Sequence, residues 1–321
     1  MTKSVLSLLL LLAAAPARAQ NSSAGTGGAS FLNLGLGDTR AMAMGRAGVA
    51  IAEGTDSLVW NPAGLGLTQT KEISYSFLRY VQGINAPLYL AYAHPLGRTV
   101  LGANVAYLGV GGFDARDANG VPITGDNVRV QDGFATFSAA RSFLYEKLFL
   151  GGSLKGVSEN NAGASNNNLV VDLGALFKPA ANLSLGMSWQ NLGGSQQDVA
   201  KVFRMGGAVR FFDMLNTSLE LSKPSDNGWQ AGIGGEFTLP EELLSVGQIS
   251  FRIGYFTTGN QGTILPQDRN FLFPLVGAQG MTFGLGLFTS QAFGYGIGLD
   301  YAMVPLGALG TSDHLTLKVK F

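Results

Sequence analysis

From Lys71 to the end of the chain, apolar and polar residues alternate with a period of two. In the run NLSLGMSWQNLG, residues 182–193, four large apolar side chains alternate with small or polar ones. This is the period of a β-strand, whose side chains point alternately to opposite faces. Soluble β-sandwiches alternate in the same way, so the pattern predicts an all-β protein without deciding where it resides.

Alternating runs of about ten residues, the length that a tilted strand needs to cross a bilayer, recur along this part of the chain. We predict strands at 71–81, 86–94, 98–109, 130–143, 147–159, 167–178, 182–193, 200–212, 215–223, 227–238, 247–257, 280–289, 292–302 and 312–321. That makes about fourteen, and an even number lets a closed antiparallel barrel begin and end on one side of a membrane.

The connections between these runs alternate in length. On the side where the chain starts, the predicted turns are short, at 94–97, 178–181, 212–214 and 290–291. The opposite side has the two longest connections, 111–129 and 258–280. Short periplasmic turns and long external loops are typical of transmembrane barrels. The sequence therefore predicts an all-β fold: a transmembrane outer-membrane β-barrel of about 14 antiparallel strands.

The first residues change the picture of where the protein acts. They combine a cation at Lys3, an apolar run at 5–15 and the small-x-small tripeptide 17–19. This pattern predicts a secretory signal peptide over residues 1–19 and export from the cytoplasm. Combined with the predicted barrel, it places the protein in the outer membrane of a Gram-negative envelope. Only 13% of the residues are charged, yet no later segment offers 18 uninterrupted apolar residues for a membrane helix.

Composition also limits the chemistry. The chain has no cysteine, which excludes disulfides and thiolate metal sites, and its 21 basic residues balance its 21 acidic ones. The balance gives no argument for a nucleic-acid partner. We expect no metal and no cofactor.

The last strand, HLTLKVKF, carries an apolar face that ends on an aromatic residue: Leu315, Leu317, Val319 and Phe321. A terminal strand of this form resembles the signal that bacterial barrel assembly machinery reads. We therefore expect the assembly machinery and outer-membrane lipid among the partners.

With the apolar face outward, several charges face the lumen. They are Lys155, Asp172, Arg204, Arg210, Glu220, Glu236, Arg252, Asp300 and Lys318. They could line a polar path for a solute, but mutual pairing is the favoured interpretation, because isolated buried charges are costly. The many lumen-facing glycines leave room for something else inside the barrel.

Residues 20–70 are predicted to fill that room as a plug, followed by the barrel at 71–321. Asp38 precedes a short helix-forming run and is a suitable N-cap. Asn61 is a second N-cap candidate, and Pro62 suits the first position of the helix that follows. Trp60 would anchor this compact apolar element against the inner wall.

Two loops suggest binding. The apolar cluster Phe271, Leu272, Phe273, Pro274, Leu275 and Val276 could contact a partner or ligand, or pack back on the barrel mouth. Between Asp114 and Asp126, several oxygen-bearing side chains surround Gly120. Calcium binding is one interpretation, but their spacing does not match the helix-flanked calcium loop, and a plain turn is favoured.

Catalysis is not expected. Ser312, Asp313 and His314 are consecutive, and consecutive strand residues point to opposite faces, so they cannot converge as a triad. Nucleophile-elbow and HExxH motifs are absent from the sequence. We therefore predict a protein that is not an enzyme.

The segment TRAMAMGRAGVAIAEGTDSLVWNPAGLG, residues 39–66, resembles the N-terminal motif of PorV/PorQ outer-membrane proteins, which are related to FadL-type long-chain fatty-acid transporters. The resemblance continues through 171–194 and 298–321. It implies a fourteen-stranded barrel whose plug contains Asn61, Pro62, Ala63 and Gly64 as the hatch element. Arg46 departs from the glycine pair of many relatives and could pair with an acidic residue of the inner wall.

The resemblance implies more than one role. The main prediction is a cargo-handling or accessory barrel in type IX protein secretion, with secreted cargo proteins or translocon subunits as partners. The alternative is a FadL-like uptake channel for hydrophobic small molecules, and the second alternative is a structural scaffold of the envelope.

Overall fold

The structure, a computed structural model, describes residues 27–79, 85–116, 119–161, 163–195, 198–244, 247–257, 280–292, 294–305 and 310–321. The predicted signal peptide, 1–19, and the apolar cluster 271–276 lie outside the described residues. No helix in the described ranges is long and apolar enough to cross a membrane.

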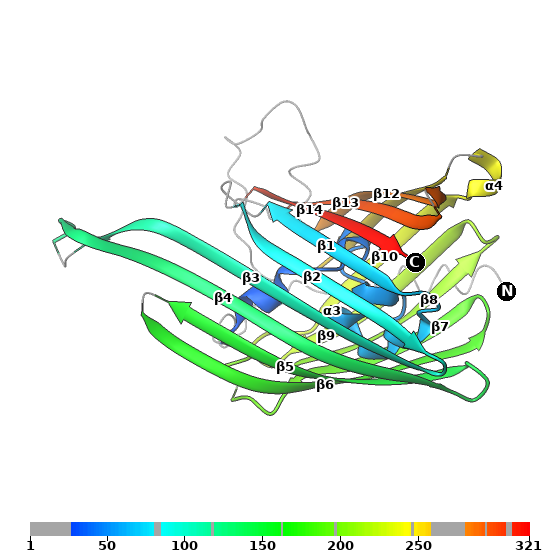
Figure 1. Cartoon of the computed structure of the whole chain (residues 1–321), viewed down its shortest axis with the longest axis horizontal. Helices are drawn as coiled ribbons and strands as arrows, with labels where there is room; N and C mark the ends of the chain where they lie inside the picture. The colour runs from blue at the N-terminus through cyan, green and yellow to red at the C-terminus, as the bar shows by residue number, and fades with distance from the viewer. Residues whose placement is uncertain are drawn as a thin grey trace.

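Fourteen strands form one closed antiparallel barrel (Figure 1). They are β1 (Glu72–Arg79), β2 (Asn85–Leu96), β3 (Thr99–Arg116), β4 (Pro122–Phe143), β5 (Leu148–Asn161), β6 (Ala164–Ala180), β7 (Leu183–Leu192), β8 (Val202–Phe211), β9 (Leu215–Pro224), β10 (Gln230–Leu239), β11 (Gln248–Phe256), β12 (Met281–Ala292), β13 (Tyr295–Pro305) and β14 (Thr311–Lys320). The barrel closes where Glu72 of β1 pairs with Lys320 of β14. Each predicted strand overlaps one of these strands, so the predicted fold class is confirmed.

Several predicted connections are wrong. The predicted loop 111–129 is mostly strand, because β3 runs to Arg116 and β4 begins at Pro122. Residues 94–96, 178–180 and 290–291, predicted as turns, also belong to strands. Backbone hydrogen bonds sustain a two-stranded ribbon through glycine and polar residues, so hydrophobic alternation ends before the strand does. The β10–β11 connection contains a short helix that the sequence analysis did not predict, α4 (Glu241–Leu244).

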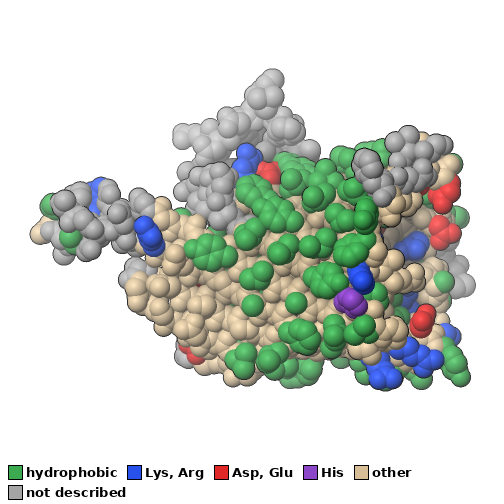
Figure 2. All heavy atoms as spheres, viewed as in Figure 1, with side chains coloured by type: hydrophobic (Ala, Val, Ile, Leu, Met, Phe, Trp, Pro, Cys, Tyr) green, Lys and Arg blue, Asp and Glu red, His purple; other side chains and the backbone are tan. Residues whose placement is uncertain are grey.

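The strands alternate in exposure as the sequence predicts. On β1, Tyr75 is 44% exposed on the outer surface while Ser76 is 3% exposed inside. Figure 2 shows hydrophobic side chains spread over the outer wall. We call the barrel end with the short turns and the C-terminus the periplasmic end, following the usual orientation of such barrels, and the opposite end the extracellular end.

The segment 27–70, in the described part of the chain before β1, lies inside the barrel (Figure 1). It forms five short helical elements: η1 (Ser30–Leu34), α2 (Thr39–Ala43), η2 (Gly54–Asp56), α3 (Ser57–Trp60) and η3 (Pro62–Leu67). Gly27 lies beside Asp226, in the extracellular β9–β10 connection, and Lys71 pairs through its backbone with Phe321 at the periplasmic end. This plug segment, residues 27–70, therefore traverses the lumen.

Candidate functional site: the interface between plug and wall

Lumen-facing glycines receive the backbone of the plug. A Cβ added at Gly232, Gly234 or Gly254 would overlap the backbone of Met44 or Gly45, just after α2. These glycines lie on β10 and β11, where any larger side chain would hold the plug away from the wall. The glycines that the sequence placed in the lumen are therefore the sites of closest plug contact.

A second glycine group receives the hatch element. Added Cβ atoms at Gly151 of β5 and Gly174 of β6 would overlap Pro62 and Asn61. Pro62 is buried, and Ala63 has no exposed surface. The hatch element thus rests directly on the barrel backbone, and its position depends on the absence of side chains there.

Asn61 joins the plug to itself and to the wall. Its Nδ2 donates to the carbonyl oxygens of Val49 at 2.8 Å and Ala175 of β6 at 3.1 Å. Its Oδ1 accepts from the backbone N–H of Ala63 at 3.1 Å, and Pro62 takes the first position of η3. The predicted capping by Asn61 is confirmed, and Asp38 caps α2 in the same way by accepting from Ala41 N at 2.8 Å.

Trp60 is fixed by a buried acid. Its indole Nε1 donates to Glu220 Oε2 at 2.8 Å, and Arg204 Nη1 donates to the other carboxylate oxygen at 2.9 Å. The guanidinium of Arg204 lies 4.5 Å from the centroid of the Trp60 ring. Val49 N also donates to Glu220, at 2.8 Å. One wall carboxylate therefore holds two separate parts of the plug.

A chain of alternating charges ties the periplasmic half of the plug to four strands. Arg40 of α2 pairs with Glu236 at 2.6 Å, and Glu236 pairs with Arg252 at 2.7 Å. Arg252 continues to Asp300 at 2.5 Å, which pairs at 3.1 Å with Lys318.

The chain of charges returns to the plug at its other end. Lys318 Nζ lies 2.5 Å from Asp56 Oδ2 in η2. Nearby, Glu72 accepts from the backbone N–H of Thr55 at 2.9 Å, and Thr39 Oγ1 lies 2.7 Å from Thr316 Oγ1. Among the described residues, all of the lumen-facing charges predicted from the sequence except Arg210 form ion pairs, which fits the pairing interpretation.

Two plug carboxyls are fully enclosed. Burial raises the pKa of Asp38 to about 6, against the opposing effects of the Ala41 N–H and of Lys318. Burial also raises the pKa of Asp56 well above its usual range, and Lys318 opposes this shift. One oxygen of each carboxyl, Asp38 Oδ2 and Asp56 Oδ1, has no hydrogen-bond partner among the described residues. The neutral form of Asp38 is therefore favoured at mildly acid pH.

Near the extracellular end, Arg46 and Lys155 take different partners. Arg46 donates to the carbonyl of Asn33 at 2.8 Å, and its guanidinium lies 5.5 Å from the centroid of the Phe256 ring. Lys155 pairs with Asp172 at 2.8 Å and donates to Asn191 at 3.0 Å.

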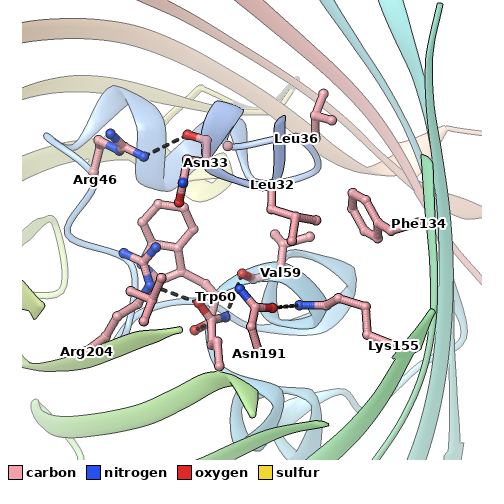
Figure 3. A pocket seen from close by; sticks show the side chains of 13 residues that line it. Leu32, Asn33, Leu36, Arg46, Val59, Trp60, Phe134, Lys155, Asn191 and Arg204 are labelled. Carbon is pink, nitrogen blue, oxygen red and sulfur yellow. Dashed lines mark hydrogen bonds between the residues drawn. The ribbon is translucent and has the colours of Figure 1, made fainter. Parts of the chain in front are cut away.

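A cavity of about 30 Å³ lies here between η1, α3 and the wall (Figure 3). Its lining is partly apolar, with Leu32, Leu36, Val59, Phe134 and Val202. Its basic side chains are Arg46, Lys155 and Arg204, and the last two are already paired with buried carboxylates. A cavity of about 320 Å³ at the periplasmic side of the plug is lined mainly by charged and polar side chains, including Arg210. The cavity on the extracellular side of the plug is therefore partly apolar, whereas the cavity on its periplasmic side is mainly polar.

Other predicted site residues lie away from the lumen. Leu315, Leu317 and Phe321 are exposed on the outer surface, and Val319 is half-buried beside them. Ser312 Oγ and His314 Nε2 are 3.0 Å apart inside, whereas Asp313 points outward and bonds Arg79 and Tyr301. The strand geometry that argued against a triad is therefore observed.

The sequence analysis missed Arg40, Asp56 and Glu72 as functional residues. For Arg40 and Asp56 the signal was present, because each is a charged residue in a segment that is otherwise mostly small and apolar, whereas Glu72 begins the polar face of a predicted strand. In such a segment a charge needs a partner.

No protein-family model matches the chain, and no curated protein matches it. Solved structures are similar to it in fold. The toluene transporter TbuX of Ralstonia pickettii has a TM-score of 0.58 and 16% identity, with 87% of this chain and 96% of that chain covered. The toluene transporter TodX of Pseudomonas putida has a TM-score of 0.54 and 14% identity, with 88% and 96% covered. A FadL homologue of Pseudomonas aeruginosa has a TM-score of 0.53 and 11% identity, with 95% and 98% covered.

Proposed function

We propose that this protein is an outer-membrane uptake channel for hydrophobic small molecules, with residues 27–70 as the plug that closes it. The observation that carries the proposal is the partly apolar cavity between plug and wall at the extracellular end. Transporters described as carrying toluene share the fold, which supports the same class of solute here. In this proposal, residues 1–19 are a cleaved signal peptide and 71–321 form the transmembrane barrel.

The uptake proposal requires the plug to move. A cavity of about 30 Å³ has room for roughly one water molecule and none for an organic solute. Leu32 in η1 and Val59 in α3 line the cavity from the plug side, so displacement of these elements would enlarge it. The buried ion pairs and the close glycine contacts hold the plug in the closed state.

A disulfide can test this requirement, because the chain has no cysteine of its own. Thr39 on the plug and Thr316 on β14 have hydroxyl oxygens 2.7 Å apart. The pair T39C/T316C should lock the plug when oxidised and release it when reduced. We expect uptake of radiolabelled toluene or oleate into cells to fall at least about tenfold on oxidation and to recover with reductant.

The matched control uses the same wall cysteine. Ser76 Oγ of β1 also lies 2.7 Å from Thr316 Oγ1, so S76C/T316C links two wall strands without touching the plug. Oxidation of this control should leave uptake unchanged. Equal uptake by the oxidised plug-locked variant and the control would contradict a moving plug.

Secretion was the main prediction from the resemblance to PorV/PorQ proteins, and uptake was its alternative. The similar structures favour the alternative, and no finding supports a link to type IX secretion or to its partners. Purification of the tagged protein in mild detergent, with mass spectrometry of bound proteins and small molecules, separates the two. Secreted proteins with a shared C-terminal domain would overturn uptake as the main role.

A further inference from the structure

At the periplasmic end of the barrel, the turns between β2 and β6 carry a group of positive charges. Arg98 lies in the β2–β3 turn, and its carbonyl accepts from Ser142 N, next to Arg141 of β4. Two strands further on, Lys178 of β6 donates its backbone N–H to Lys147 O at 2.7 Å. The turns of β2 to β6 thus bring two pairs of cations to one arc of the rim.

These cations have no acidic partners in the part of the chain that the structure describes. Arg98, Arg141 and Lys147 are exposed, and none of the four forms an ion pair there. The lumen cations differ, because nearly all of them are paired. In a chain whose total charge is zero, an unpaired group of four cations indicates an anionic partner from outside. Figure 2 shows Lys and Arg side chains gathered at the periplasmic end of the face in view.

The same arc presents apolar and aromatic residues to its surroundings. Tyr145 is fully exposed, and Leu144 and Phe143 are 63% and 42% exposed. Leu144, Tyr145 and Glu146 all have left-handed backbone conformations, with φ of 51°, 55° and 64°, although none is glycine. Aromatic side chains beside cations are typical of a membrane interface, where rings enter the headgroup layer and cations meet phosphate.

We propose that this arc binds the phosphate of an anionic phospholipid in the inner leaflet of the outer membrane. Arg98 and Arg141 are the principal phosphate ligands, since a guanidinium makes two parallel hydrogen bonds to phosphate oxygens. Lys147 and Lys178 supply further positive charge, and the tip 143–145 packs against the acyl chains. The lipid proposal requires that the barrel lies in a bilayer. It does not depend on the proposed uptake function, so each proposal can be contradicted without the other.

Charge complementarity selects this occupant. The opposite arc of the periplasmic rim carries Asp213 and, on α4, Glu241 and Glu242, whereas the arc of β2 to β6 carries the four cations and a single acid, Glu146. A zwitterionic headgroup carries its own cation beside the phosphate. Its electrostatic attraction to this arc is therefore weaker than that of an anionic headgroup. Basic pockets at membrane interfaces are known to prefer anionic headgroups for this reason.

Native mass spectrometry of the full-length protein provides the test. The delipidated protein is incubated with mixed micelles that contain equal amounts of phosphatidylglycerol and phosphatidylethanolamine, and the retained lipids are counted. The wild type should retain phosphatidylglycerol in preference. Each of R98Q and R141Q should weaken this retention roughly fivefold, and the double variant roughly thirtyfold. R98K/R141K should keep most of the binding.

The matched control is R129Q, which removes an exposed cation from the extracellular part of the same strand, β4. It should retain phosphatidylglycerol like the wild type, and the heat-dependent gel mobility of folded barrels verifies that every variant is folded. Unchanged retention by folded R98Q/R141Q, or equal retention of the two lipids by the wild type, would overturn the proposal. The proposal would also be overturned if the protein retained lipopolysaccharide and only R129Q lost this retention. That result would place the anion site at the extracellular end of the barrel.

Discussion

Arg252 on β11 forms an ion pair of 2.5 Å with Asp300 on β13, two strands away, by passing over β12. The crossing is made at Gly286, where an added Cβ would lie 2.6 Å from Arg252 Nη2 and 2.8 Å from Asp300 Oδ1. Gly286 therefore leaves the space that this ion pair needs to cross β12. The same pair connects to Arg40 and Asp56 of the plug through Glu236 and Lys318.

Gly286→Ala should separate this ion pair. The methyl group occupies the space between the two charged groups, and we expect a loss of about 1–3 kcal/mol, the usual range for overpacking a filled interior. The midpoint of urea-induced unfolding in detergent would report the change. Gly235→Ala on β10 is the matched control, because nothing lies within 4 Å of its added Cβ. Equal midpoints for the two variants would show that the crossing contributes nothing to stability.

Gly174→Ala should unseat the hatch element while the barrel stays folded. The added methyl group would overlap Asn61 Oδ1, which caps η3, and only the plug can give way without breaking strand pairing. We expect larger and more frequent conductance steps in planar bilayers than with the wild type. Gly156→Ala on β5 has open space at its Cβ and should behave like the wild type. Conductance of Gly174→Ala equal to that of the wild type would mean that the plug stays closed when Asn61 is displaced.

Pro62→Gly should loosen the plug without adding bulk. Proline fixes the backbone of the first residue of η3. Glycine has more conformational freedom in the disordered plug, so its ordering should cost about 1 kcal/mol more conformational entropy. Asn61→Ala should have a larger effect, because it removes the cap and the bonds to Val49 and Ala175 together. Planar-bilayer conductance would rank the variants. Conductance of Asn61→Ala below that of Pro62→Gly would contradict the role given to the asparagine.

The plug should become less stable as pH rises from about 4 to about 6. Burial raises the pKa of Asp38 to about 6 from a usual value near 4, so the folded plug binds more protons than the unfolded one in this window. Where the folded state binds more protons, its stability falls with increasing pH. Hydrogen exchange of the amides of residues 39–67, corrected for the intrinsic pH effect, should therefore be faster at pH 7 than at pH 4.

Asp38→Asn provides the comparison for this pH effect. Asparagine keeps an oxygen that can accept from Ala41 N but has no charge to bury. The variant should show at least the protection of the wild type at pH 7 and a smaller difference between pH 4 and pH 7. The same pH difference in both proteins would assign the effect to another group, with Asp56 the first candidate because its pKa is also raised by burial.

Local patterns predicted the parts that depend on neighbours in sequence. Alternation on strands such as β1 and β7 predicted their positions and their outward faces. The Asn-Pro pair at 61–62 predicted a cap and a first helical turn, because both effects act within three residues. The outer part of the β3–β4 hairpin was missed, since a run such as GGFDAR has no hydrophobic alternation and is held by strand pairing alone.

Contact partners could not be predicted in the same way. The contacts of Arg46 with the Asn33 carbonyl and the Phe256 ring had no signal in the sequence. Arg252 and Asp300 are 48 positions apart, and their meeting depends on the stagger of three strands. Barrel register is set by the whole closed ring of hydrogen bonds, which no local segment contains.

The sequence by itself therefore determined the strand number, the apolar outer wall and the capped elements of the plug, because each follows from local periodicity or local capping. Tertiary structure alone decided which wall charge holds which plug charge, and that glycines of the wall lie under the hatch element. Those relations arise when the barrel closes around the plug and places residues that are distant in the chain within a few ångströms of one another.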